Sequence, residues 1–300
     1  MLAPSLNSAP GCLPSSIERK SMYYKSILVH VDQSRHAAQR IRLAAEIAIA
    51  EEAHLVGTAM TGISRFMVDQ GMVEMNGVIV AAQLKVLHQQ ADAALTTFET
   101  LAKQCGVLSF ESRVVDDEPE GGLALQARYC DLVVVSQPDP DEAGFGLYSD
   151  LPGYVMLNCA RPVLMIPYAG RFERIGQHVL IAWDGSQQAT RAITGAIGML
   201  KRAASVAIVV FNSTKAGRNH GAEPGADIAL YLSRHGIRVD VLQDETDIDI
   251  GNALLSLAAD RRTDLLVMGG YGHSRFREVL LGGVTMKILD TMTLPVLMAH

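Results

Sequence analysis

The chain has 300 residues, of which 49% are hydrophobic and 19% are charged, and its formal net charge is −6 at pH 7. This composition is typical of a globular protein large enough for two domains, and it excludes an intrinsically disordered chain. The acidic balance and the lack of a long basic run argue against nucleic acid as a main partner. No apolar run reaches the roughly 18 residues that a membrane-spanning helix needs, so we expect no membrane partner either.

Residues 1–21 differ in composition from the rest of the chain. They mix proline, serine and asparagine and show no hydrophobic period. Pro4, Pro10 and Pro14 interrupt the apolar core that a signal peptide would require. We therefore expect a disordered extension, or a true start of translation at Met22.

The four cysteines are scattered and form no CxxC pair or metal-like spacing. They stand at Cys12, Cys105, Cys130 and Cys159. This pattern predicts reduced thiols in a cytoplasmic protein.

From residue 22 onward, apolar strands alternate with helical patterns. The first set of strands is expected near 25–31, 54–60, 110–115, 131–136 and 162–166. The helices between them are expected near 35–51, 78–104, 119–129 and 150–159, with Ser34 as the N-cap of the first. These strands are continuous Val, Ile and Leu runs, which indicates a parallel sheet that is buried on both faces.

The second half of the chain repeats the first. Three segments recur, namely 25–34 at 177–186, 131–135 at 264–268, and the identical Pro-Val-Leu-Met of 162–165 at 295–298. The offset is 152 residues for the first segment and 133 for the other two, so the second copy is 19 residues shorter in its middle. We infer a tandem duplication.

The second copy has the same alternation of elements. Its strands are expected near 178–183, 205–211, 237–242, 264–269 and 295–299, and its helices near 186–203, 224–235, 249–261 and 283–292, with Ser186 as the first N-cap. We predict two domains, at 22–168 and 177–300, each an α/β unit with a doubly wound parallel sheet of five strands. The repeated final strands are expected to pair the two copies as a pseudo-dimer about a pseudo-twofold axis.

Two glycine clusters follow the fourth strand of the second copy. Gly269, Gly270 and Gly272 leave the strand, and Gly282 and Gly283 precede the last helix. Glycines here expose backbone N–H groups at a helix N-terminus, which is an arrangement that favours an anion. No Gly-Lys pair is present, as a P-loop would require, and the third glycine of a dinucleotide-binding fingerprint is missing.

The spacing resembles that of the universal stress protein family, over about residues 22–300. The loop of that family has a glycine, two residues, a second glycine, nine residues, a third glycine and then Ser or Thr. Gly269, Gly272 and Gly282 match this spacing. Gly283 departs from it where the ATP-binding members have a hydroxyl, and Thr285 supplies one two residues later.

The resemblance implies an adenine nucleotide alpha hydrolase-like, Rossmann-like fold and a stress-response protein that binds ATP, AMP or another adenine nucleotide in the second copy, with magnesium as an optional companion ion. By this resemblance, Asp184 would meet the adenine or ribose edge. The base would be lined by Ala182, Val210 and Met268, and ribose and phosphates would be held by Gly269, Gly272, Gly282, Gly283, Val284 and Thr285. His273 and Arg275 are candidate phosphate contacts.

Other interpretations stay open. The glycines could serve only a tight turn and a helix start, and Asp184 could be a turn residue like its counterpart Asp32. In the first copy, prolines and acids such as Asp139 replace the loop, so we expect no phosphate site there. A different ligand under residues 61–77, such as a lipid, is a further alternative. His30 is expected to be a satisfied core residue.

The alternative function is a nucleotide-independent scaffold of the universal stress protein type that acts through a homodimer or an unknown protein partner. No nucleophile motif, Cys/His pair or spaced carboxylate pair indicates an enzyme, and the nine histidines form no metal-binding pair. We therefore predict no catalytic residues, no metal ligand and at most slow, incidental ATP hydrolysis.

Overall fold

The computed structural model describes residues 23–63, 77–142, 150–213, 223–270 and 283–300. Two predictions therefore lie outside the described residues. One is the disordered extension at 1–21, and the other is the part of the glycine loop that contains Gly272, His273, Arg275 and Gly282.

The described residues of the first copy form five strands and the helices that connect them. The strands are β1 (Ser26–His30), β2 (His54–Met60), β3 (Phe110–Val115), β4 (Leu132–Ser136) and β5 (Val163–Ile166). The helices are α1 (Ala37–Glu51), α4 (Gly77–Cys105), α5 (Pro119–Gln126) with a short 3₁₀ turn η1 (Ala127–Tyr129), and α6 (Leu151–Asn158). These bounds agree with the predicted elements to within about two residues for nearly every one.

The second copy repeats this order. Its strands are β6 (His178–Ala182), β7 (Ser205–Phe211), β8 (Asp240–Asp244), β9 (Leu265–Gly269) and β10 (Val296–Ala299). Its helices are α7 (Gln187–Arg202), α8 (Ala226–Arg234), α9 (Ile250–Asp260) and α10 (Gly283–Thr291).

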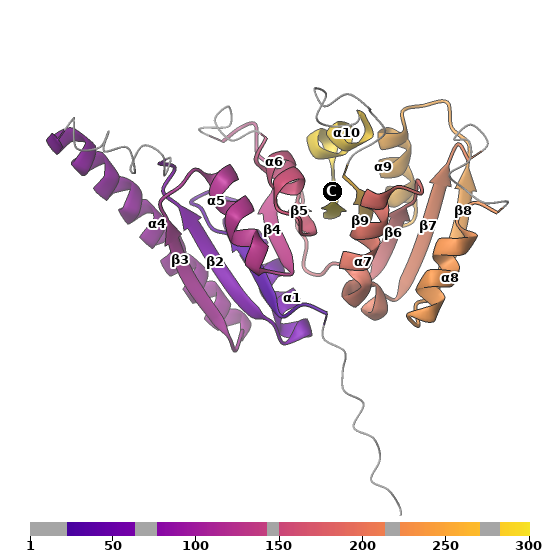
Figure 1. Cartoon of the computed structure of the whole chain (residues 1–300), viewed down its shortest axis with the longest axis horizontal. Coiled ribbons are helices and arrows are strands. Elements are labelled where there is room, and N and C mark those ends of the chain that lie inside the picture. The colour runs from indigo at the N-terminus through magenta and orange to yellow at the C-terminus, as the bar shows by residue number, and fades with distance from the viewer. Residues whose placement is uncertain (1–22, 64–76, 143–149, 214–222, 271–282) are drawn as a thin grey trace, which may run out of the picture.

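The two sets of strands join edge to edge in one ten-stranded sheet of order β3-β2-β1-β4-β5-β10-β9-β6-β7-β8 (Figure 1). Pairing is parallel within each copy and antiparallel between β5 and β10, where Leu164 lies opposite Leu297. The predicted pairing of the final strands is thus confirmed. The two five-stranded sheets are continuous, because the identical Pro-Val-Leu-Met segments meet at the centre of the molecule.

Helices cover both faces of the sheet. One buried core unites alternate strand residues such as Ile27 and Ile181 with α1, α4, α7 and α8. A second core on the opposite face unites the intervening residues, such as Leu28 and Leu180, with α5, α6, α9 and α10. Each core extends through both copies, so the copies share their hydrophobic interior. The predicted α/β, doubly wound architecture is confirmed.

Two local predictions are wrong. The strand expected at 237–242 is β8 at Asp240–Asp244, because Ile237 is buried ahead of the strand and its apolar side chain shifted the expected start. Ser34 does not cap α1, which begins after His36 without a side-chain cap. The hydroxyl of Ser34 instead donates to Asp32 Oδ1 at 2.6 Å. Ser186 does cap α7, since its side chain accepts the N–H of Ala189.

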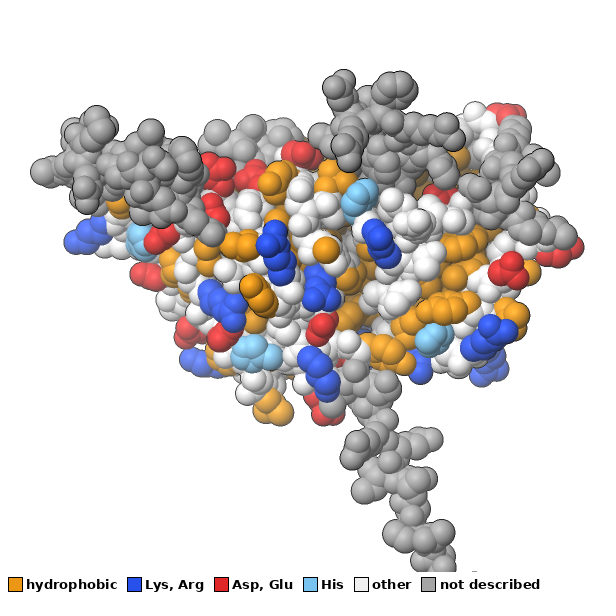
Figure 2. All heavy atoms as spheres, viewed as in Figure 1, with side chains coloured by type: hydrophobic (Ala, Val, Ile, Leu, Met, Phe, Trp, Pro, Cys, Tyr) orange, Lys and Arg blue, Asp and Glu red, His pale blue; other side chains and the backbone are white. Residues whose placement is uncertain are grey.

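Among the described residues, no helix is both long and apolar enough to span a bilayer. On the face shown in Figure 2, Lys and Arg side chains lie scattered among hydrophobic and acidic ones. The visible surface of the described residues therefore shows no continuous basic area of the kind that binds nucleic acid.

Candidate functional site

In the second copy, the structure brings the two predicted halves of the nucleotide site together. β6 and β9 are parallel neighbours, and Ala182 at the end of β6 is in register with Met268 on β9. Asp184 follows β6, and Gly269 ends β9. Strand order reverses between β6 and β9, and ligands of such sheets bind beyond the carboxyl ends of the strands at this point.

Asp184 has a local structural role at this edge. Its side chain is exposed, and Oδ1 accepts the backbone N–H of Ser186 at 2.9 Å. Ser186 in turn caps α7. The carboxylate thus shapes the turn between β6 and α7, and the exposed carboxylate still faces solvent beyond the strand ends.

The glycines of the loop differ in what surrounds them. A Cβ on Gly269 would lie 2.6 Å from the backbone nitrogen of Ala189, and one on Gly270 would lie 1.9 Å from the Met156 sulfur. Packing against the α7 backbone therefore requires glycine at position 269, whereas a Cβ at position 270 would require the Met156 side chain of α6 to move. Gly283, at the start of α10, has no neighbouring atom within 4 Å of such a Cβ among the described residues.

The remaining predicted residues lie at different depths. Val210 and Met268 are buried in the two cores on opposite faces of the sheet. Ala182 and Val284 are half-buried, and Thr285 in the first turn of α10 is buried with 2% of its surface exposed. Gly283, Val284 and Thr285 together form the N-terminal turn of α10, whose backbone N–H groups have no partner within the helix.

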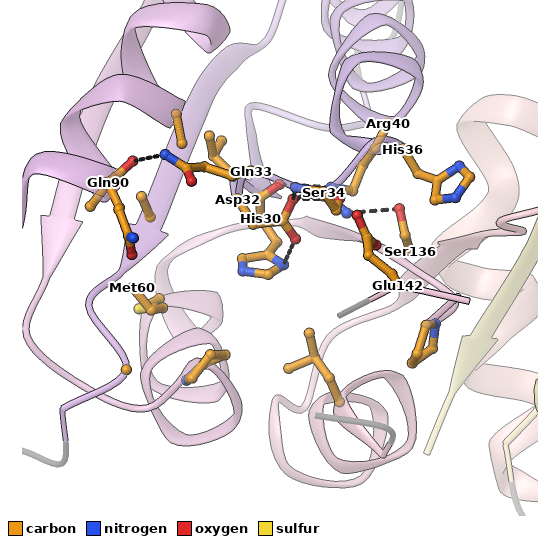
Figure 3. A pocket seen from close by; sticks show the side chains of 18 of the residues that line it. His30, Asp32, Gln33, Ser34, His36, Arg40, Met60, Gln90, Ser136 and Glu142 are labelled. Atoms are coloured by element: carbon orange, nitrogen blue, oxygen red, sulfur yellow. Dashed lines mark hydrogen bonds and ion pairs between the residues drawn. The ribbon is translucent and has the colours of Figure 1, made fainter. Parts of the chain in front are cut away.

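In the first copy, a cavity of about 550 Å³ lies at the carboxyl ends of β1, β2 and β4. It is lined by side chains from the end of β1, from the α4 helix and from the chain after β4 (Figure 3). On one side of the view in Figure 3, the Gln33 amide donates a hydrogen bond to the Gln90 carbonyl. Ser136 and Glu142 lie on the other side, and His30 and Asp32 lie between the two sides. This is the strand-order reversal of the first copy, equivalent in position to the predicted site of the second.

A buried arginine anchors this site. Arg40 on α1 is 1% exposed, and its guanidinium donates to the His30 carbonyl at 2.7 Å, to Ser136 Oγ at 2.8 Å and to Asp32 Oδ1 at 2.8 Å. Burial acts to raise the pKa of Asp32, but Arg40 and the hydrogen bond from Ser34 hold it well below its usual range. The guanidinium therefore ties the ends of β1 and β4 together and keeps Asp32 ionised.

A second ionic cluster closes the rim of the cavity. Asp139, whose side chain is almost fully buried, accepts from Arg35 Nε at 2.8 Å and contacts His36 Nε2 at 2.6 Å. Burial acts to raise the pKa of Asp139, but the hydrogen bonds from His36, from the Asp141 N–H and from Arg35 lower it to about 2. The acids that replace the glycine loop in the first copy thus bind the N-terminal end of α1.

His30 is buried, as predicted, but it is not satisfied. Its Nδ1 makes no hydrogen bond with the described residues and lies 3.5 Å from Asp32 Oδ2. Burial lowers the pKa of His30 to about 4, with Asp32 opposing and Arg40 reinforcing the shift. The imidazole is therefore neutral at pH 7, with one ring nitrogen available toward the cavity.

We expect His30 to make the protein sensitive to mild acid. An unfolded histidine takes up its proton near pH 6.5, whereas His30 in the folded chain resists protonation until about pH 4. The unfolded state then binds more protons, so the free energy of unfolding should fall by about 2 kcal/mol from this residue between pH 7 and pH 5. Denaturant unfolding of the wild type and of His30→Gln, each at pH 7 and at pH 5, measures this loss of unfolding free energy. An equal loss in both proteins would rule out this contribution.

Sequence reasoning did not find the cavity of the first copy. It treated His30 as a core residue and Asp32 as a turn residue, and it judged this copy only by its lost glycine loop. One signal was present in the sequence. Arg40 occupies a helical position between apolar residues, and its counterpart 152 residues later is Ala192. A charged residue on the buried side of a helix requires a buried partner.

The described residues contain no group of three or more His, Cys, Asp or Glu side chains arranged to hold a metal ion. Cys105, Cys130 and Cys159 are free thiols. Burial raises the pKa of both Cys130 and Cys159, so these two thiols are poor nucleophiles at pH 7.

Comparison with known proteins identifies the fold and the family. Residues 176–300 match the model of the universal stress protein family. The chain is 24% identical over 255 residues to the universal stress protein Slr1230 of Synechocystis, and the match covers 82% of this chain and 83% of that protein.

Two crystal structures share the fold over most of the chain. A universal stress protein from Archaeoglobus fulgidus superposes with a TM-score of 0.72 at 14% identity, covering 92% of this chain and 97% of that one. A putative universal stress protein from Pseudomonas aeruginosa superposes with a TM-score of 0.54 at 16% identity, covering 92% and 93%. The predicted relation is therefore confirmed: residues 176–300 are a domain of the universal stress protein family, in a chain whose first half repeats the same fold.

Proposed function

We propose that the protein is a stress-response regulator that binds one adenine nucleotide, ATP or AMP, in its second copy. The site would lie beyond the carboxyl ends of β6 and β9, between Asp184 and the first turn of α10. The observation that carries this proposal is the parallel pairing of β6 with β9, because Asp184 follows the first strand and Gly269 ends the second at a point of strand-order reversal.

The N-terminus of α10 supports an anion at this place. Its first-turn N–H groups have no partner within the helix, and the helix dipole adds partial positive charge there. Gly283 is exposed, so the backbone at this turn is open to a phosphate. In the proposal, Gly269, Gly272, Gly282 and Gly283 admit the phosphates, and His273 and Arg275 offset their charge.

A second candidate is a scaffold that works without a nucleotide. The observation in its favour is that Gly269 is required by packing against the backbone of Ala189, and Gly270 lies against the side chain of Met156. Packing alone can therefore explain why glycine occupies these positions, without a ligand. Under this alternative the protein acts through a second copy of the chain or another protein.

In either case we propose a cytoplasmic protein that is not an enzyme. Under the nucleotide proposal, magnesium would accompany ATP through the phosphates. Hydrolysis would be slow and incidental, and phosphate release over many turnovers at the rate of a true ATPase would contradict this part of the proposal.

Calorimetric titration of the full chain with ATP and magnesium, and with AMP, tests the proposal. We expect saturable binding near one site per chain. Gly283→Asp places a carboxylate where the phosphates would lie and should weaken ATP binding by about tenfold or more, which is the effect of losing ~1.4 kcal/mol. Gly283→Ser restores the hydroxyl of the family pattern and should tighten it.

Gly121 offers a matched control, since it also lies in the first turn of a helix, α5, with nothing within 4 Å of a Cβ. Gly121→Asp and Gly121→Ser should leave ATP binding unchanged. If neither the wild type nor Gly283→Ser binds ATP at millimolar concentration, the scaffold interpretation replaces the nucleotide switch.

A further inference from the structure

The cavity of the first copy has the features of a separate ligand site. Its volume of about 550 Å³ lies within the range of about 300–1,000 Å³ that is typical of small-molecule pockets. It lies at the reversal of strand order between β1 and β4, where doubly wound sheets bind ligands. All of its lining residues belong to the first copy.

Unpartnered polar atoms gather on this cavity. Within the described part of the chain, four buried side-chain atoms make no hydrogen bond, and three of them belong to residues that line the cavity: His30 Nδ1, Thr61 Oγ1 and Gln137 Oε1. The fourth is Thr58 Oγ1. Each of these residues is at most 6% exposed, and an unsatisfied buried polar atom costs about 1–3 kcal/mol. A ligand with matching groups would remove this cost.

Gln137 indicates which kind of group is missing. Its Nε2 donates to the carbonyls of Leu289 at 2.8 Å and Asp290 at 3.1 Å, at the end of α10. This pair of bonds fixes the orientation of the amide, so the free atom is the oxygen, which only accepts. The Thr61 hydroxyl can accept as well, whereas His30 Nδ1 faces the Asp32 carboxylate at 3.5 Å. The cavity therefore calls for a ligand that donates hydrogen bonds.

The charges of the lining disfavour an anion. Asp32, Asp139 and Glu142 line the cavity together with Arg40. Arg40 is already bound to Asp32, the Arg35 side chain is bound to Asp139, and Glu142 Oε1 accepts the backbone N–H of Arg35. Three carboxylates outnumber these two guanidinium groups, both of which are already engaged, so a phosphate would meet a net negative surface.

Apolar side chains from both faces of the sheet also line the cavity, which suits a ligand with a hydrophobic body. They are Ala59, Ala91 and Ala94 from one core, Met60 and Leu151 from the other, and Leu87 on α4. We propose that the first copy binds an uncharged, hydrogen-bond-donating molecule of about nucleoside size and excludes its phosphorylated forms.

Adenosine and AMP are a suitable pair of probes, because they differ only in the phosphate. Protein labelled with ¹³C at the methionine methyl groups reports on the cavity through Met60, whose signal is assigned with Met60→Leu. We expect adenosine to shift the Met60 methyl signal saturably, and AMP to do so at least tenfold more weakly. The titration is repeated in Gly283→Asp, in which we expect weaker phosphate binding in the second copy. A Met60 shift that persists in this variant reports on the first copy alone, so the two proposals are tested separately.

Two threonine variants locate the site. Thr61→Val removes an unpartnered hydroxyl that lines the cavity just after β2, and Thr58→Val removes an unpartnered hydroxyl on β2 that does not line it. Both should leave the unfolding midpoint unchanged or higher, because each removes a buried unsatisfied atom. Only Thr61→Val should weaken adenosine binding, by about tenfold, which corresponds to losing ~1.4 kcal/mol.

Three results would overturn the proposal. The first is that adenosine at concentrations up to about 5 mM does not shift the Met60 methyl signal, because a specific site should be largely saturated at that concentration. The second is equal binding of AMP and adenosine, which would show that the acidic lining does not select. The third is an equal loss of binding in Thr58→Val and Thr61→Val, which would place the effect in the strand rather than the cavity.

Discussion

Val296→Asp is expected to unfold the chain or to reduce its stability by more than about 4 kcal/mol, because it buries an unpaired carboxylate. Val296 lies on β10 at the centre of the ten-stranded sheet, with no exposed surface, opposite Met165 of the first copy. Its side chain belongs to the core that both copies share. The measurement is the denaturant midpoint, together with near-ultraviolet circular dichroism for tertiary packing.

Val114→Asp is the matched control. Val114 lies on β3, the edge strand of the same sheet, and is 37% exposed. A carboxylate there keeps contact with water, so we expect a change of about 1 kcal/mol or less. If Val296→Asp is no more destabilising than Val114→Asp, the β5–β10 junction does not hold the two copies together.

Arg40→Met has the second largest expected effect, a loss of about 3 kcal/mol, near the lower end of what breaking a buried ion pair costs. The variant leaves Asp32 without its guanidinium and removes the link between the His30 carbonyl and Ser136. We place the loss at the lower end because one-third of the Asp32 side chain is exposed and water can solvate the carboxylate.

A double-mutant cycle separates the charge from the packing. Asp32→Asn removes the carboxylate that Arg40 neutralises, so the double variant should recover part of the stability that Arg40→Met loses. Chemical unfolding of the four proteins gives the coupling energy between the two side chains. Additive losses would mean that Arg40 stabilises through its bonds to the His30 carbonyl and Ser136 alone.

The second copy shows that the fold does not need this arginine. The position equivalent to Arg40 on α7 is Ala192, which is also buried. There the turn acid Asp184 accepts a backbone N–H and remains exposed. The two copies therefore use the same strand ends differently. The first copy fills part of the region with an ion pair and has a cavity beside it. The described part of the second copy has Gly269 and Gly270 at the end of β9 and Gly283 at the start of α10.

The sequence by itself determined the order of elements, the duplication and the sheet type. Continuous apolar runs of four to seven residues, separated by helical periods, allow little else than a parallel sheet with helices on both faces. The repeated Pro-Val-Leu-Met segments also predicted the junction, since an apolar edge strand present in both copies must be covered. These features are local or periodic, so they can be recognised before the chain is folded.

Only the tertiary structure decided what the strand ends hold. The partners of Arg40 lie 10, 96 and 8 residues away in the chain, and Gln137 bonds a helix 152 residues later. Position 269 likewise requires glycine because α7 approaches from elsewhere in the sequence, and Gly270 lies against the side chain of Met156 on α6. Side chains meet at these places because strands distant in sequence become neighbours, and no periodicity in the sequence encodes that proximity.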